Sequence, residues 1–146
     1  MPAWSLWSFG KAAAVRIKRT TCDALFSNYV RARDKWTCQM CDRRFPKGAQ
    51  NLHCAHIYSR RHWAGRHWTG SKEIPSNAIA LCFFCHQSSG ENPISFARWC
   101  DERFGAEAMD RLYAFVHQTS KKTKYEEDLR IMGLKEMLAR LEAVNG

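Results

Sequence analysis

The sequence lacks any long hydrophobic run, and this absence excludes several classes of protein. No stretch approaches the roughly 20 apolar residues that a membrane-spanning helix needs. The N-terminus also lacks the continuous apolar segment of a signal peptide, because Ser5, Ser8, Gly10 and Lys11 interrupt it. We therefore expect a cytoplasmic protein without a membrane partner, whose 146 residues form about one domain.

Acidic residues are scarce in the first half of the chain. Residues 1–66 contain 13 basic and 3 acidic side chains, whereas residues 67–146 contain 10 basic and 11 acidic ones. The formal net charge of +9 therefore originates in the first half. A basic surface of this kind favours a polyanionic partner, most commonly nucleic acid, and solubility alone is the alternative explanation.

Cysteine, in contrast, is abundant, with seven residues. In a reducing compartment, paired C-x-x-C spacing favours a metal site over disulfides. Cys38, Cys41, Cys82 and Cys85 supply the four sulfur ligands of a tetrahedral zinc ion, and a site closed in this way is structural. The remaining cysteines, which we expect to be buried apolar residues, are Cys22, Cys54 and Cys100.

The hydrophobic pattern predicts a small α+β protein with two strands, a helix that follows the second strand, a zinc knuckle and flanking helices. The expected helices are Asp23–Asp34, one from Cys85 onward, Ile94–Phe104, Ala106–His117 and Glu126–Val144. The expected strands are Gln50–Ile57 and Ala78–Leu81, with a knuckle hairpin at Trp36–Phe45 and a polar loop at Tyr58–Ser76. Gly105 is placed to end a helix.

Two apolar faces indicate how the outer helices pack. Leu25, Phe26, Tyr29 and Val30 form one face of the first helix, and a stripe from Ile131 to Leu141 runs along the last. We expect this stripe to pack on the same domain, with a dimer contact as the alternative. The resulting division is a basic arm (1–21), a zinc-containing core (22–105) and C-terminal helices (106–146). The arm could follow a phosphate backbone or be an unstructured terminus.

Three polar residues lie close to the cysteine pairs. Phosphodiester hydrolysis needs an activated water, a cation to stabilise charge on the phosphate, and basic side chains to hold the strand. His56 is the candidate base because a neutral imidazole can deprotonate water near pH 7. Asn77 is the candidate orienting residue, and His86 is the candidate ligand of a catalytic cation.

His56, Asn77 and His86, together with the cysteine pairs, resemble the pattern of HNH (ββα-metal) endonucleases. Residues 20–105, including Cys54-Ala-His-Ile-Tyr-Ser-Arg-Arg61, are more narrowly similar to the phage NinG/Rap recombination nucleases. The resemblance implies a DNA endonuclease that uses Mg²⁺ or Mn²⁺, acts on branched recombination intermediates in a bacterial host cell, and leaves 5′-phosphate and 3′-hydroxyl ends. A homodimer would suit symmetric cutting of a junction, although nothing in the sequence requires one.

The sequence departs from the family pattern at Ala55, where most HNH enzymes have an Asp or His that binds the cation. His53 is a candidate substitute, but on a strand it shares a face with Ala55 and not with His56. Glu91 and Asn92 are further candidates, one to two turns after His86.

Several arginines are candidates for phosphate contacts, since guanidinium groups bind phosphate in bidentate geometry. These residues are Arg31 and Arg33 on the first helix and Arg60, Arg61 and Arg66 in the polar loop. In the same loop, Trp63 and Trp68 could stack on unpaired bases or pack onto the core. We expect His62 and His67 to be surface groups.

Three alternatives to a nuclease follow from the same residues. Ala55 favours a non-catalytic zinc module that binds nucleic acid. A zinc deaminase is excluded, because that chemistry needs a Glu two residues after the histidine and the residues there are Ala55 and Tyr58. A zinc knuckle that binds another protein leaves the basic first half unexplained.

Overall fold

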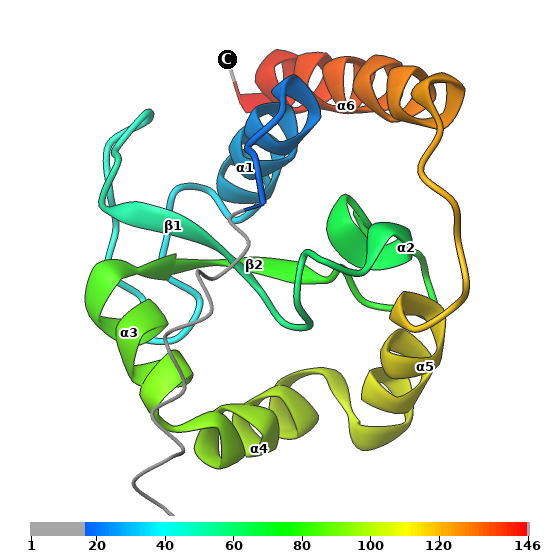
Figure 1. Ribbon diagram of the computed structural model, residues 1–146. Coiled ribbons are helices and arrows are strands. Elements are labelled where there is room, and N and C mark those ends of the chain that lie inside the picture. Colours follow the sequence, from blue (N-terminus) through cyan, green and yellow to red (C-terminus); the bar gives the residue numbers. More distant parts are fainter. Residues whose placement is uncertain (1–16, 146) are drawn as a thin grey trace, which may run out of the picture.

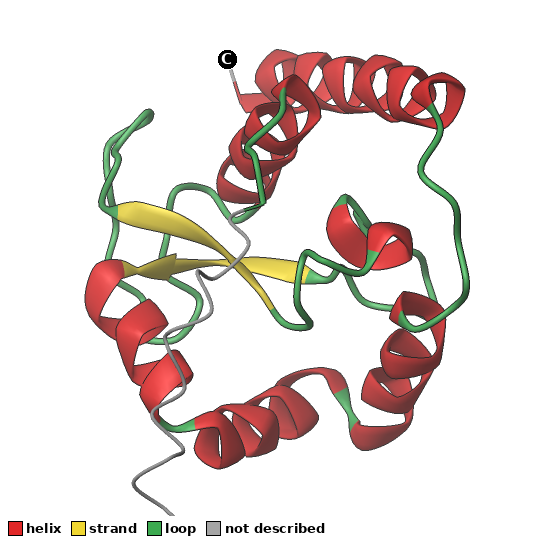
Figure 2. Ribbon diagram, viewed as in Figure 1, coloured by secondary structure: helices red, strands yellow, loops and turns green. Residues whose placement is uncertain are grey.

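The computed structural model describes residues 17–145, so most of the predicted arm lies outside the described residues. In this part of the chain, helices surround a two-stranded antiparallel sheet (Figures 1 and 2). The elements in chain order are α1 (Thr21–Arg33), β1 (Leu52–His56), α2 (Trp63–Arg66), β2 (Ala78–Cys82), α3 (Phe83–Glu91), α4 (Pro93–Phe104), α5 (Ala106–Val116) and α6 (Lys124–Asn145).

The two strands and the helix that follows them form a ββα unit. The register runs from Leu52 opposite Cys82 to His56 opposite Ala78. Every residue of β2 is buried, which explains its continuous apolar sequence. Helix α3 begins two residues before the predicted start at Cys85, because Cys82 acts as its N-cap and the Cys82 Sγ accepts a hydrogen bond from the Cys85 amide.

Helix α1 begins after a reciprocal cap that fixes its start. The Thr20 hydroxyl accepts from the Asp23 amide at 3.2 Å, and the Asp23 carboxylate accepts from the Thr20 amide at 2.9 Å. The predicted apolar face is confirmed: Phe26 and Val30 are buried in one cluster with Leu134 of α6. The stripe on α6 therefore packs on the same chain, as expected.

The knuckle between α1 and β1 covers the edge of β2 that faces away from β1. Thr37 and Arg44 form the single bridge of the predicted hairpin. The Gln39 amide donates to the Ala80 carbonyl at 2.9 Å, and the Ala80 amide donates to the Asp34 carboxylate at 2.8 Å. The backbone of β2 thus has partners on both sides, which explains how this strand can be buried although the sheet has only two strands.

The predicted polar loop is partly helical, because α2 forms inside it and packs on α5. Gly105 has a φ of +92° and ends α4, as predicted. None of the described helices is long and apolar enough to cross a membrane. The fold is a small ββα core with a four-cysteine cluster and flanking helices, which confirms the predicted fold class.

Candidate active site and zinc site

The four predicted cysteines converge at the junction of the knuckle, β2 and α3. The sulfur atoms of Cys38, Cys41, Cys82 and Cys85 all lie within 4.8 Å of one another, and those of Cys41 and Cys82 are 3.8 Å apart. Zinc–sulfur bonds of about 2.3 Å in a tetrahedron place the sulfurs about 3.8 Å apart. The cluster therefore fits zinc, and its four thiolates would complete the coordination sphere.

A basic groove of about 930 Å³ lies on the β1 side of the sheet. His53, His56 and His86 contribute to its lining. Arginines from three segments also line it, namely Arg19, Arg31 and Arg60. The structure thus places the candidate base, the candidate cation ligand and several guanidinium groups around one cavity large enough for a nucleotide-sized group.

His56, at the end of β1, is held by the backbone of α2. Its Nε2 donates a hydrogen bond to the Arg66 carbonyl oxygen at 2.9 Å. Since Nε2 carries the proton in this arrangement, Nδ1 retains a lone pair that can accept one. Burial lowers the pKa of His56 below its usual value of 6.5, which favours the neutral form at neutral pH.

Asn77 precedes β2, is fully buried, and fixes the loop that supports His56. Its amide nitrogen donates to the carbonyls of Tyr58 and Gly65, each at 3.0 Å, and its amide oxygen accepts from the Tyr58 amide at 2.9 Å. Gly65 directly precedes the residue whose carbonyl binds His56. The side chain of Asn77 therefore acts on the loop and not on the imidazole itself.

Glycine is required at position 65 because this loop passes very close to α5. A Cβ atom added there would lie 2.5 Å from the Val116 side chain and 3.1 Å from the Asn77 amide nitrogen. With any larger residue, either α2 or the Val116 side chain would have to shift. The small residue thereby allows the hydrogen bonds that position the Arg66 carbonyl.

His53 and His86 face each other at the other end of the groove. Their Nδ1 atoms are 3.0 Å apart. Two nitrogens bound to one six-coordinate cation at about 2.1 Å in adjacent positions would also be about 3.0 Å apart. The pair therefore fits either a hydrogen bond or joint binding of a cation. Burial lowers the pKa of His86, which keeps its ring neutral and able to bind a metal.

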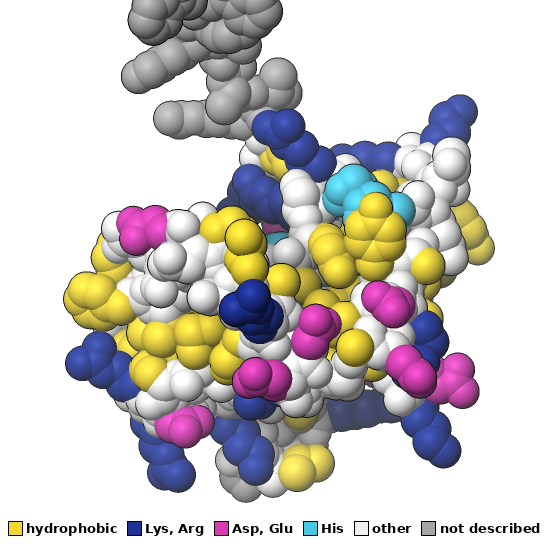
Figure 3. All heavy atoms as spheres, turned by 90° about the horizontal axis from the view of Figure 1, so that it is seen from below, with side chains coloured by type: hydrophobic (Ala, Val, Ile, Leu, Met, Phe, Trp, Pro, Cys, Tyr) yellow, Lys and Arg dark blue, Asp and Glu magenta, His cyan; other side chains and the backbone are white. Residues whose placement is uncertain are grey.

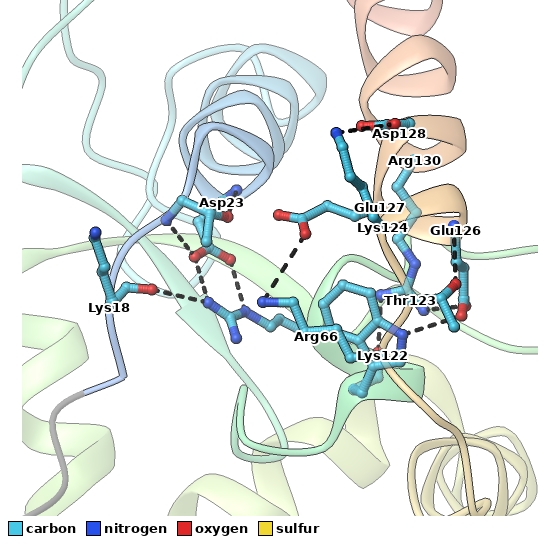
Figure 4. Close-up of polar contacts among 12 residues, drawn as sticks. Lys18, Asp23, Arg66, Lys122, Thr123, Lys124, Glu126, Glu127, Asp128 and Arg130 are labelled. Carbon is cyan, nitrogen blue, oxygen red and sulfur yellow. Dashed lines mark hydrogen bonds and ion pairs between the residues drawn. The ribbon is translucent and has the colours of Figure 1, made fainter.

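Arg66 is 7% exposed, and its guanidinium is engaged inside the protein (Figure 4). It donates to both carboxylate oxygens of Asp23, at 2.8 and 2.5 Å. Burial alone would raise the pKa of Asp23, but hydrogen bonds from His67, Arg66 and Thr20 hold it well below its usual range. This ion pair ties the start of α1 to the loop that supports His56, so the guanidinium is not presented to the groove.

His67 is buried, so its expected position on the surface is wrong. Its Nε2 donates to Asp23 at 2.7 Å, and Arg130 of α6 donates to its Nδ1 at 3.1 Å. Burial lowers the pKa of His67, which is consistent with a neutral ring that donates on one side and accepts on the other. This contact could not be predicted from local pattern, because Arg130 lies 63 residues away from His67.

Trp63 links the same loop to α6. Its ring lies 4.0 Å from the Arg130 guanidinium, and its indole nitrogen donates to Glu126 at 3.2 Å. Trp68 stacks on Phe115 with ring centroids 4.3 Å apart. Both tryptophans therefore pack onto the protein, the second of the two arrangements that the sequence allowed.

The remaining predicted arginines divide between the groove and other surfaces. Arg31 lies over the Trp36 ring and donates to the Ala49 carbonyl at 3.0 Å. Arg33 instead binds Asp34 and the Ala78 carbonyl, away from the groove. Two further arginines follow β1: Arg60, which lines the groove, and the exposed Arg61. Arg19 was missed as an individual groove residue, although it belongs to the predicted basic arm.

Glu91 and Asn92 do not approach His86. Glu91 accepts a hydrogen bond from Gln87, and Asn92 caps the end of α3 with its side chain bound to the Ser88 carbonyl. Neither residue lines the groove. The predicted burial of Cys22 and Cys100 is confirmed, while Cys54 is half-buried at the groove wall.

Residues 38–92 match the family model described as HNH endonuclease. This segment contains both strands, α2 and α3, together with the four cysteines and His53, His56, Asn77 and His86. Arg19 and Arg31 of the groove lie before it. The match indicates nuclease activity on a nucleic acid. Comparisons with curated proteins and with solved structures found no match, so the narrower NinG/Rap resemblance stays a prediction.

Proposed function

We propose that this protein is a divalent-cation-dependent DNA endonuclease and that His56 is its general base. The observation that carries the proposal is the hydrogen bond from His56 Nε2 to the Arg66 carbonyl. It sets the tautomer in which Nδ1 can take a proton, inside a basic groove that also contains His53 and His86. The family match of residues 38–92 supports the same reaction class.

In the proposed reaction, His56 Nδ1 removes a proton from a water molecule that attacks the phosphorus atom. A new P–O bond forms, the bond from phosphorus to the 3′-oxygen breaks, and the departing oxygen takes a proton from solvent. These steps leave the 5′-phosphate and 3′-hydroxyl ends that the resemblance implies. The lowered pKa of His56 keeps the base neutral before the reaction begins.

His53 and His86 are the residues that we expect to hold the catalytic cation. A bound Mg²⁺ or Mn²⁺ would stabilise the negative charge on the phosphate and on the departing oxygen. Their nitrogen atoms are close enough to share one ion, and they lie in the same groove as His56. His53 would thereby replace the ligand that is missing at Ala55.

The other residues position the base and the substrate. Asn77 holds the loop whose carbonyl binds His56, so it is a positioning residue. Arg19, Arg31 and Arg60 line the groove and would bind the phosphates of the strand. We leave Arg33 and Arg66 out of this set, because neither residue lines the groove.

The structural zinc, the DNA substrate and its branching are also parts of the proposal. Four cysteines with suitable distances support zinc. The groove charge supports DNA, whereas branched recombination intermediates, a phage origin and a homodimer rest on the resemblance alone. The second candidate is a zinc-stabilised nucleic-acid-binding module without activity, and Ala55 is the residue that favours it.

A nicking assay tests the proposal. Wild type and His56→Ala, each first shown to hold one zinc per chain, would be incubated with Mg²⁺ or Mn²⁺ and either supercoiled plasmid or a synthetic four-way junction. We expect cleavage by wild type and a loss of at least about 100-fold in the variant. Binding of both DNAs without cleavage by wild type would identify the non-catalytic module instead.

A further inference from the structure

Phe83 and Phe84, at the start of α3, are large apolar residues left in solvent. Their side chains are 50% and 68% exposed, and their rings lie edge to face with centroids 5.5 Å apart. They occupy the two positions between Cys82 and Cys85. Because both cysteine sulfurs are directed into the cluster, the phenylalanines between them cannot also turn into the core.

This aromatic pair is continuous with the groove. The Phe83 ring packs edge to face on His53 with centroids 5.9 Å apart, and His53 in turn faces His86. Both histidines line the groove that also contains Arg19, Arg31 and Arg60. Figure 3 views the molecule from below, and hydrophobic side chains gather on its left. This is the side on which α3 lies in Figure 1.

We propose that Phe83 and Phe84 form a stacking surface for an unpaired base next to the cleaved phosphate. This inference rests on the proposed function and extends it to the class of substrate. A strand whose phosphate lies between His56 and His86 has its neighbouring bases within reach of α3. In a duplex these bases are stacked on each other, whereas in single-stranded or branched DNA they can pack on an aromatic ring.

A base fits this surface better than a protein side chain does. The basic groove beside it has the charge for a phosphate backbone, and aromatic rings next to a basic groove are the usual combination in proteins that bind single strands. The two tryptophans for which the sequence left base stacking open, Trp63 and Trp68, instead pack onto the protein. Phe83 and Phe84 are thus the exposed aromatic pair beside the groove among the described residues.

The test measures binding without cleavage, in the His56→Ala background and without added divalent cation. The probes are a single-stranded oligonucleotide with one 2-aminopurine and the matching duplex. We expect Phe84→Ala to weaken binding of the single strand about tenfold and to relieve quenching of 2-aminopurine, while the affinity for duplex stays unchanged. Phe84→Trp should retain both signals, and Phe84→Leu should lose them because it keeps apolar bulk without a π-face.

Ile94→Ala is the matched control, because Ile94 is 72% exposed on α4 and is not among the groove residues. It should leave both affinities unchanged. Equal weakening on single strand and duplex, or no change in any Phe84 variant, would overturn the inference. A change in self-association, seen by sedimentation, in place of a change in binding would instead assign the surface to a second copy of the chain. If the stacking signals were present but wild type had no nuclease activity, the proposed function would be contradicted and the stacking surface would not.

Discussion

The Nε2 of His56 lies 2.9 Å from the carbonyl oxygen of Arg66, and this contact joins the candidate base to most of the molecule. The Arg66 side chain binds Asp23 of α1 (Figure 4). The neighbouring His67 and Trp63 bind Arg130 of α6. The flanking helices therefore hold the loop that sets the tautomer of the base. They lie outside the segment that matches the family model.

The pH dependence of cleavage should report on His56. In the proposed mechanism the neutral imidazole is the active form. Burial lowers the pKa of His56, so at saturating cation kcat/KM should fall only as the pH drops below the usual value of 6.5. Because the positive charge of Arg60 also lowers this pKa, Arg60→Gln should move the acid limb to higher pH.

Arg61→Gln is the control for this shift, since it removes a positive charge at the next, exposed position. It should weaken DNA binding at most, with the acid limb where it is in wild type. An acid limb that stays in place in both variants would argue that a group other than His56 titrates.

Replacing Asn77 should loosen the support of the base. Asn77→Asp keeps the shape of the side chain but places a carboxylate oxygen against the carbonyl oxygens of Tyr58 and Gly65, where the amide nitrogen donated hydrogen bonds. We therefore expect a loss of at least about 2 kcal/mol in the free energy of unfolding. Urea denaturation measures this loss. Below the unfolding transition, kcat should fall more than KM rises. Asn51→Ala, at an exposed amide, should change stability by less than about 0.5 kcal/mol.

Breaking the buried pair of Asp23 and Arg66 should destabilise the protein strongly. Asp23→Asn leaves the Arg66 guanidinium buried without its counter-ion, which typically costs about 3–5 kcal/mol. Because the pKa of Asp23 is lowered by folding, its contribution is present above the usual value for a carboxyl and is lost as the pH falls towards the folded value. The difference between wild type and variant should therefore shrink in acid.

A surface pair provides the comparison for this variant. Asp128→Asn breaks the exposed contact with Lys124, and we expect a loss of less than about 1 kcal/mol. A double variant, Asp23→Asn with Arg66→Met, should be more stable than Asp23→Asn alone, because no unpaired charge stays buried. If the double variant were less stable, the ion pair would not be the source of the loss.

Removing zinc should unfold the core. The cluster joins the knuckle to β2 and α3, so Cys41→Ala or a strong chelator should abolish zinc binding and lower the thermal midpoint. Metal analysis and circular dichroism measure the two effects. Cys100→Ala, a buried cysteine in another part of the core, should keep one zinc per chain. A chelated protein with an unchanged thermal midpoint would contradict the structural site.

His53 should contribute to the affinity for the catalytic cation. His53→Ala removes one of two facing nitrogens, so Mn²⁺ binding followed by electron paramagnetic resonance should weaken by about tenfold or more. His62→Ala, which removes a histidine outside the groove, should leave the affinity unchanged. Wild-type affinity in His53→Ala would show that the cation is held by other groups.

The parts of the core that depend on local sequence pattern could be predicted from the amino-acid sequence alone. Spacing predicted the cysteine cluster, because two residues between cysteines suit a turn that presents both sulfurs to one ion. Apolar periodicity predicted the buried face of α1 and the packed stripe of α6, because the period follows directly from helix geometry.

Which charged and aromatic groups face the groove depends on contacts between segments that are distant in the sequence. Arg66 and Arg60 both lie in the loop after β1 and look alike in the sequence. Arg66, however, is buried in an ion pair with Asp23, which lies 43 residues earlier. In the same way His53 could be placed beside His86 only once β1 and α3 were packed together. A side chain's exposure depends on partners that folding brings from distant positions, and local periodicity contains no record of them.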